Sequence, residues 1–160
     1  TDYYADSVQW AVENGITTGV TATTFVPNNT CTQAQILTFL WRSQGTPAAS
    51  SVAPLGIGSD KYYYGAVNWA YENGIIDGSF TPNGACTRAT AVDYIYKSQG
   101  SPAVNGSNAF TDVNGSDSYA DAVMWAVENG VTTGVTSTTF VPDKTCTRAQ
   151  IATFLYRALA

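Results

Sequence analysis

The stretch that decides the fold is Phe140-Val141-Pro142-Asp143-Lys144-Thr145-Cys146-Thr147-Arg148-Ala149-Gln150-Ile151, close to the end of this 160-residue chain. Two earlier segments follow the same pattern, at residues 25–36 and 80–91. Self-similarity at a regular period is the signature of one supersecondary unit that has been copied and stacked. We therefore expect three units that share a core.

Each unit is expected to contain a turn that leads into a long helix. A proline precedes this helix, and a threonine stands at its N-cap, where the hydroxyl can accept a hydrogen bond from a free backbone amide. These threonines are Thr32, Thr87 and Thr147. Gln35 and Gln150 complete a capping box in the first and third units, whereas the second unit has Thr90 there. The first long helix is apolar on most of its sides, which is typical of a helix in the middle of a molecule.

Each unit has one cysteine, directly before the capping threonine. The three are Cys31, Cys86 and Cys146. Each stands five residues before a helical position that can pack against it, which is the spacing of a hydrophobic staple. Three thiols that met at an axis could bind zinc, but an unpaired cysteine is more often a small core residue. We expect free, buried cysteines, and neither a metal nor a cofactor.

Arg88 and Arg148 occupy the first position of two long helices. The helix dipole makes a cation there unfavourable by roughly 0.3–1 kcal/mol. An arginine beside unpaired amides suits an anion, above all a carboxylate, which a guanidinium can grip with two hydrogen bonds. The alternative is an ordinary ion pair with an acidic neighbour such as Asp112 or Asp77. Gln33 takes this position in the first unit, so a site there is expected to be uncharged and weaker.

A shorter helix that stops at a glycine is expected near the start of each unit. These helices lie within residues 3–15, 63–74 and 119–130. Each carries a tryptophan about 200° around the helix from its apolar stripe. These residues are Trp10, Trp69 and Trp125. Two interpretations are open: a neighbouring unit packs on the tryptophan, or the indole is a platform for a sugar ring.

Two linkers rich in Ser, Ala, Pro and Gly, at residues 46–54 and 101–108, mark the boundaries between units. We therefore divide one domain into residues 1–46, 47–102 and 103–160. The third unit opens thirteen residues before its tryptophan, and the same distance back from Trp10 passes the first residue. The first unit is thus expected to be truncated, and the chain to be a piece of a longer protein.

The composition argues against several classes of function. Charged residues make up 12% of the chain, about half of the roughly 25% that is usual in soluble domains. The net charge of −5 disfavours nucleic acid, whose binding needs Lys and Arg on phosphates. The chain has no histidine, the commonest general base and metal ligand. No apolar run is long enough to predict membrane insertion.

The order of motifs resembles the S-layer homology domain of bacterial surface proteins. The elements that carry this resemblance are Phe-x-Asp, Trp-Ala, Glu-Asn-Gly, Phe-x-Pro and Thr-Arg-Ala, and the resemblance covers nearly the whole chain. Its strongest parts are residues 87–89 and 147–149, both Thr-Arg-Ala. Thr90 and Gln150 replace the acidic residue that follows in the family, and Gln33 replaces the first arginine.

The resemblance implies an all-α fold of three helix-loop-helix repeats in a pseudo-threefold arrangement around a central three-helix bundle. It also implies an extracellular, non-catalytic module of a larger surface protein that anchors it to secondary cell wall polysaccharide. In the family the glycan, often a pyruvylated amino sugar, lies in grooves between units.

Carried over by position, Arg88 and Arg148 would meet the carboxylate, while Gly78 and Gly134 would let the sugar approach the backbone. The three tryptophans would form a wall of the groove. Gln33 and Asp112 complete the candidate glycan-binding residues.

Two other functions compete with anchoring. In the first, the units self-assemble or pack on the rest of a surface-layer protein without binding glycan. In the second, the chain is an enzyme, but a glycosidase needs two carboxylates across a cleft. The recurring acidic residues Glu13, Glu72 and Glu128 stand instead at a plain helix-end position, one per unit, so we expect no catalysis.

Overall fold

The computed structural model describes residues 2–160 and contains six α-helices in that range. In chain order they are α1 (Ala5–Glu13), α2 (Gln33–Ser43), α3 (Tyr64–Glu72), α4 (Arg88–Ser98), α5 (Ala120–Glu128) and α6 (Arg148–Leu159). The described part of the chain contains three isolated β-bridges but no β-strand. The predicted all-α class is therefore confirmed.

The long helices α2, α4 and α6 begin where their threonine caps predict. The Thr32 side chain accepts a hydrogen bond from the Gln35 amide at 3.2 Å, and the Gln35 side chain accepts one from the Thr32 amide at 3.0 Å. Thr147 and Gln150 form the same capping box in α6. In α4, Thr87 caps the Thr90 amide at 3.1 Å without the reciprocal bond.

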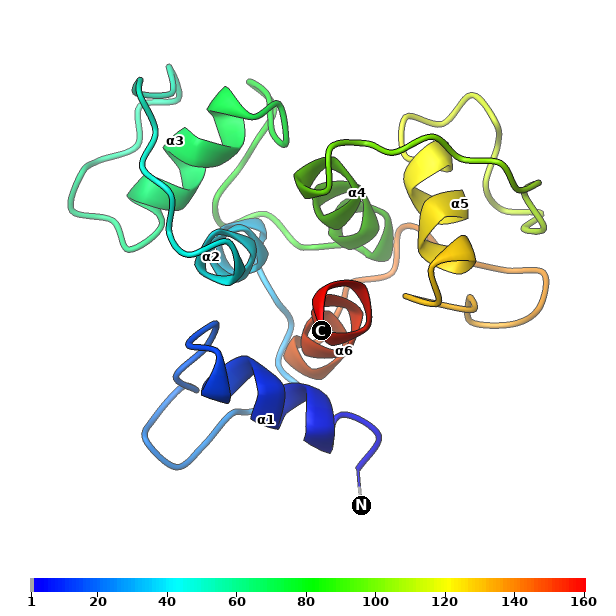
Figure 1. Cartoon of the computed structure of the whole chain (residues 1–160), viewed down its shortest axis with the longest axis horizontal. Helices are drawn as coiled ribbons and strands as arrows, with labels where there is room; N and C mark the ends of the chain where they lie inside the picture. Colours follow the sequence, from blue (N-terminus) through cyan, green and yellow to red (C-terminus); the bar gives the residue numbers. More distant parts are fainter. Residues whose placement is uncertain (1) are drawn as a thin grey trace.

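The three long helices lie in the middle of the molecule and the three short ones surround them (Figure 1). Each short helix packs against a long helix of another unit: α3 against α2, α5 against α4, and α1 against α6. Because α1 closes on the last helix of the chain, all three units depend on one another for their packing.

A closed ring of backbone hydrogen bonds joins the three units beneath the long helices. The Cys86 amide donates to the Cys31 carbonyl at 3.0 Å, and the Cys146 amide donates to the Cys86 carbonyl at 2.8 Å. The Cys31 amide completes the ring by donating to the Cys146 carbonyl at 3.0 Å. All three thiols are free and buried, which confirms the prediction.

Two tryptophans pack on long helices of other units. The Trp10 ring lies 5.6 Å from the ring of Tyr156 in α6, and the Trp125 ring lies 5.7 Å from the ring of Tyr96 in α4. Trp125 and Trp69 are buried, at 6% and 7% exposure, whereas Trp10 is partly buried. Packing by a neighbouring unit is therefore observed for Trp10 and Trp125, and a platform for a sugar ring, which is compatible with such packing, stays a prediction.

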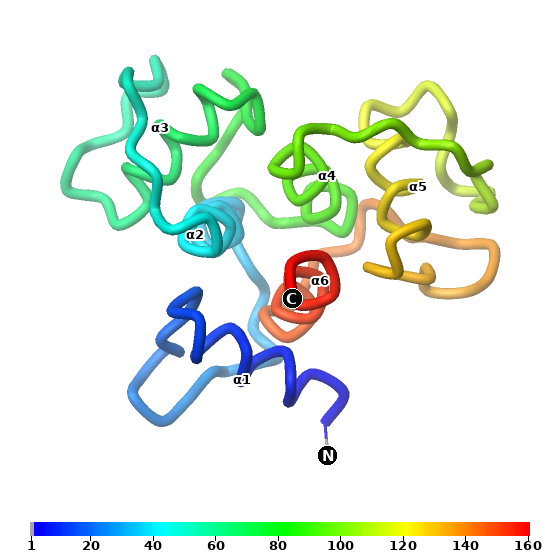
Figure 2. Tube along the Cα trace, viewed as in Figure 1, coloured from blue at the N-terminus to red at the C-terminus, as the bar shows by residue number. Residues whose placement is uncertain are grey.

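Each linker runs past the short helix that follows it, the first past α3 and the second past α5, as the trace in Figure 2 shows. The carboxylate of Glu72, at the end of α3, accepts a hydrogen bond from the Ser50 amide at 3.0 Å. Glu128, at the end of α5, accepts one from the Asn105 amide at 3.1 Å. These acidic residues thus fasten the linkers to the helices. No helix in residues 2–160 is both long and apolar enough to cross a bilayer.

Candidate functional site

Three pockets lie at corresponding places, and each is built by all three units. Each pocket contains the loop after a short helix and one side of the long helix that follows in the same unit. The preceding unit, counted cyclically, contributes the first residue of its long helix to the pocket. The next unit contributes a residue that lies just before its short helix. We name the pockets after the helix-start residue: the Arg88, Arg148 and Gln33 pockets, with volumes of about 180, 220 and 450 Å³.

Arg88 is almost buried, at 5% exposure, and is held by the loop before α6. Its Nε donates to the Phe140 carbonyl at 2.7 Å, and one terminal nitrogen lies 3.5 Å from the Thr132 hydroxyl. The guanidinium carbon lies 4.8 Å from the centre of the Phe140 ring and 5.5 Å from that of Phe154. These contacts fix the guanidinium at the wall of the pocket without neutralising it.

Arg148 repeats this arrangement at 6% exposure. Its Nε donates to the Phe25 carbonyl at 2.9 Å, and its guanidinium carbon lies 4.7 Å and 5.6 Å from the ring centres of Phe25 and Phe39. Within residues 2–160 its two terminal nitrogens have no hydrogen-bond partner. Every fully buried side-chain nitrogen or oxygen in that range has one, so these nitrogens reach the pocket surface.

Neither arginine is part of an ion pair. In the part of the chain that the structure describes, the one ion pair joins Lys97 to Asp93. Burial lowers the pKa of both guanidinium groups, but arginine stays protonated in proteins. The alternative that Arg88 or Arg148 pairs with an acidic neighbour is therefore wrong.

The two arginine pockets are cationic. Arg157 of α6 lines the Arg88 pocket, and Arg42 of α2 lines the Arg148 pocket, while no Asp or Glu lines either one. The second arginine donates to the carbonyl that opens the pocket loop: Arg42 to Ile16 at 3.2 Å, and Arg157 to Val131 at 3.4 Å. Each pocket thus presents two positive charges and no negative one.

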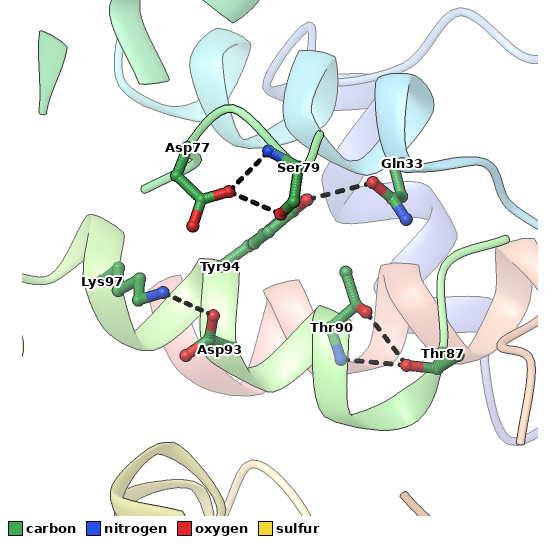
Figure 3. A network of polar contacts seen from close by, with 8 residues as sticks. All are labelled: Gln33, Asp77, Ser79, Thr87, Thr90, Asp93, Tyr94 and Lys97. Carbon is green, nitrogen blue, oxygen red and sulfur yellow. Dashed lines mark hydrogen bonds and ion pairs between the residues drawn. The ribbon is translucent and has the colours of Figure 1, made fainter. Parts of the chain in front are cut away.

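The Gln33 pocket has the opposite character (Figure 3). Asp77, Asp93 and Asp143 line it together with Lys97, whose ammonium is 2.8 Å from the Asp93 carboxylate. Burial raises the pKa of Asp93, and the contact with Lys97 offsets part of that rise. Because the cation is paired, the pocket retains an excess of negative charge.

Gln33 itself is engaged within this pocket. Its side-chain oxygen accepts a hydrogen bond from the Tyr94 hydroxyl at 3.3 Å (Figure 3) and one from the Thr81 amide at 3.4 Å. Its amide nitrogen donates to the Ala85 carbonyl at 3.4 Å. The residue that replaces arginine is therefore tied to the protein rather than presented to a ligand.

Two valines beside the arginine pockets have left-handed backbone. Val26 has φ 56° and Val141 has φ 57°, a region that costs a β-branched residue of order 1–3 kcal/mol. Each directly follows the phenylalanine whose carbonyl holds an arginine. Thr81, the corresponding residue at the Gln33 pocket, is not in this region. A strained valine is thus present in each of the two loops whose phenylalanine carbonyl accepts a hydrogen bond from an arginine.

The structure brings together only part of the predicted site. Arg88 and Gly134 line one pocket, whereas Gly78 lines none of the three. Gly134 has φ 91°, and a Cβ there would lie 2.5 Å from the Phe110 ring. Gly78 does not have a positive φ, and a Cβ there would have no atom within 4 Å. The need for glycine at position 134 is thus explained by the turn and by the packing of Phe110, whereas open space surrounds Gly78.

The tryptophans and Asp112 are placed elsewhere. Trp10, Trp69 and Trp125 line none of the three pockets. The Asp112 carboxylate accepts hydrogen bonds from the amides of Phe140 and Val141, at 2.9 Å and 2.8 Å. It therefore shapes the loop that holds Arg88 instead of facing the pocket.

Sequence reasoning missed the second arginines and two tyrosines. Tyr3 lines the Arg88 pocket and Tyr62 lines the Arg148 pocket, with 65% and 58% of their surface exposed. A signal for the second cation was present in the sequence, since each unit has one nine residues after its helix-start residue. These cations are Arg42, Lys97 and Arg157.

A model of the S-layer homology domain matches residues 1–37, 57–92 and 109–152, which together make up most of the chain. The chain belongs to the S-layer homology family. Domains of this family are cell-wall anchoring modules found in surface-layer proteins and in surface enzymes. Membership therefore associates this chain with the cell surface.

Curated relatives show the same range of contexts. The chain is 28% identical to an S-layer protein of Bacillus thuringiensis subsp. finitimus, over 94% of this chain and 19% of that protein. It is 30% identical to an endoglucanase of Bacillus sp. (strain KSM-635), over 88% of this chain and 16% of the enzyme. An amylopullulanase of Thermoanaerobacterium thermosulfurigenes is 27% identical over 96% of this chain and 9% of its own length. The S-layer homology chain thus spans less than a fifth of each of these relatives.

Proposed function

We propose that this chain is a non-catalytic anchoring module that binds secondary cell wall polysaccharide through anionic groups of the glycan. The observation that carries the proposal is the pair Arg88 and Arg148, which are almost buried, have no acidic partner and line pockets. A buried charge without a counter-ion is costly. A ligand carboxylate would supply the missing counter-ion.

A pyruvylated amino sugar fits this chemistry. Its ketal carboxylate can accept two parallel hydrogen bonds from a guanidinium, a geometry stronger and more specific than a single neutral bond. Gly134 in the Arg88 pocket and Gly19 in the Arg148 pocket add no side chain to the lining that the sugar would meet. Threonine hydroxyls in both arginine pockets, such as Thr132 and Thr17, can bond the remaining sugar oxygens.

We also propose that residues 1–46, 47–102 and 103–160 form one pseudo-threefold domain that works at the cell wall as part of a larger surface protein. The cyclic bonds between the cysteines and the corresponding places of the three pockets support this arrangement. So does the short span of the chain within its relatives. The individual grooves then lie between neighbouring units.

The test is retention on a column that carries purified secondary cell wall polysaccharide. The double variant Arg88→Met/Arg148→Met keeps much of the side-chain volume and removes both charges, so retention should fall by tenfold or more. Lys97→Met is the matched control, because it removes a cation that already has an acidic partner. It should be retained like the unmodified chain.

Circular dichroism and the melting temperature report whether each variant is folded. A folded double variant with unchanged retention would overturn the proposed site. Loss of retention in the Lys97→Met control to the same extent would show that general charge, not these two arginines, governs binding.

A further inference from the structure

We propose that the chain has two anionic-ligand sites rather than three, and that each depends on a second arginine and an exposed tyrosine. The sites are the Arg88 pocket with Arg157 and Tyr3, and the Arg148 pocket with Arg42 and Tyr62. The inference rests on the proposed function and specifies which grooves and which further residues perform it.

The two arginine pockets match each other residue by residue. Both have the sequence Thr-Thr-Gly in the loop, and both have Gln, Thr, Phe and Arg on the long helix at the same spacing. The Gln33 pocket differs at every one of these helix positions, where it has Thr90, Asp93, Tyr94 and Lys97. Two equivalent sites and one divergent pocket are therefore expected.

The second arginine adds to the positive charge of each site. Arg42 and Arg157 each use one terminal nitrogen on a loop carbonyl, and neither has a carboxylate within ion-pair distance in residues 2–160. A guanidinium carries five N–H donors, so several remain for a ligand. An anion in the pocket would meet guanidinium groups from two different long helices.

The exposed tyrosine suits the sugar ring that carries the anion. Tyr3 and Tyr62 are among the most exposed large side chains of the chain, yet each lines a cationic pocket. Each ring packs edge-on against the next tyrosine, with ring centres 5.1 Å apart for Tyr3 and 4.9 Å apart for Tyr62. An aromatic face beside polar groups is a good surface for a sugar. Ser118 is the corresponding residue at the Gln33 pocket.

An anion is disfavoured in the Gln33 pocket for three reasons. Gln33 has no charge, Lys97 is paired with Asp93, and Asp77 and Asp143 add negative charge to the lining. Like charges that are close together repel each other, and this repulsion is stronger in a partly buried pocket than in bulk water. The largest of the three pockets is therefore expected to stay without the anionic sugar.

The experiment is isothermal titration calorimetry of the whole chain with a pyruvylated amino sugar. We expect two binding events per chain. Arg157→Gln should weaken one event by tenfold or more and leave the other unchanged, and Arg42→Gln should do the same for the other event. Lys97→Gln is the matched control at the third pocket and should leave both events intact.

Two further arms separate a ligand contact from a structural effect. Arg42→Lys and Arg157→Lys should recover part of the lost affinity, because the charge returns without the planar fork. The same amino sugar without the ketal should bind more weakly, and its affinity should not change in the Arg42→Gln or Arg157→Gln variant.

Three equal events, or folded Arg42→Gln and Arg157→Gln variants with undiminished affinity, would overturn this inference while leaving the proposed function in place. Absence of binding by the unmodified chain to both the sugar and the polysaccharide column would overturn the proposed function and this inference with it.

Discussion

Arg88 and Arg148 are cations kept where two effects disfavour them: a helix start and an almost buried surrounding. Their contacts with two carbonyl groups and four aromatic rings hold the guanidinium in place. None of these contact partners carries a negative charge, and the Asp112 carboxylate acts on Arg88 only from beyond ion-pair distance. The proposed anion from outside the chain would explain why arginine is nevertheless present at both positions.

The sequence pointed to these two arginines as site candidates because an arginine directly after an N-cap threonine is unusual by itself, and the structure places both at pocket walls. The places of Tyr3, Tyr62, Arg42 and Arg157 beside these arginines could not be predicted in the same way. Each of them lines a pocket whose other residues come from different units. Their proximity depends on how the units pack, which local patterns do not report.

Asp93 gives a prediction about pH. Burial raises its pKa in the folded protein, although Lys97 partly opposes the rise. Between the ordinary pKa of an aspartate, about 3.9, and the raised value, the folded state binds more protons than the unfolded state. The contribution of Asp93 to the free energy of unfolding therefore falls as the pH rises through this window.

Asp93→Asn removes this titration, so its stability relative to the unmodified chain should increase as the pH rises from about 3 to 6. Urea unfolding at a series of pH values measures the difference. Asp121→Asn, at an exposed position of α5, controls for the loss of one negative charge. A difference that stays level or declines with rising pH would contradict the assigned cause.

At the scale of elements, capping chemistry predicted the long helices well. Their first residues lie directly after the expected threonines, and two capping boxes are formed. The short helices start one or two residues later than the limits expected from the sequence. They have no side-chain cap in the structure, which explains why their starts were less well defined.

The loops before the long helices were less predictable. Nothing in the sequence indicated left-handed backbone at Val26 and Val141, because valine is poorly suited to it. This conformation accompanies the hydrogen bonds from the arginines to the preceding carbonyls. Tertiary contacts with another unit thus override the local preference of the chain.

At the scale of the molecule, the ring of cysteine amides and carbonyls ties the three units into one core. Repetition in the sequence predicted the sharing of a core, but not the order in which the units pack. That order follows from the contact between α1 and α6, the first and last helices of the chain.

The cysteines offer a measurement of this shared core. Burial raises the pKa of the Cys31 thiol to about 12 and that of Cys146 to about 11, and it raises that of Cys86 as well. Because the thiolate is the reactive form, a disulfide reagent at pH 8 should modify none of them in the folded chain.

As urea is added, all three thiols should become reactive together at the global unfolding transition seen by circular dichroism. Denatured chain serves as the reference for three modified thiols. Modification of one cysteine at a clearly lower urea concentration than the others would show that one unit unfolds independently, which would contradict a single shared core.

The most direct test of anchoring by the two arginines is a crystal structure of the chain soaked with a pyruvylated amino sugar. We expect sugar in the Arg88 and Arg148 pockets, with the ketal carboxylate within hydrogen-bonding distance of those guanidinium groups, and none in the Gln33 pocket. Sugar bound only elsewhere, or bound with its carboxylate turned away from both arginines, would contradict it.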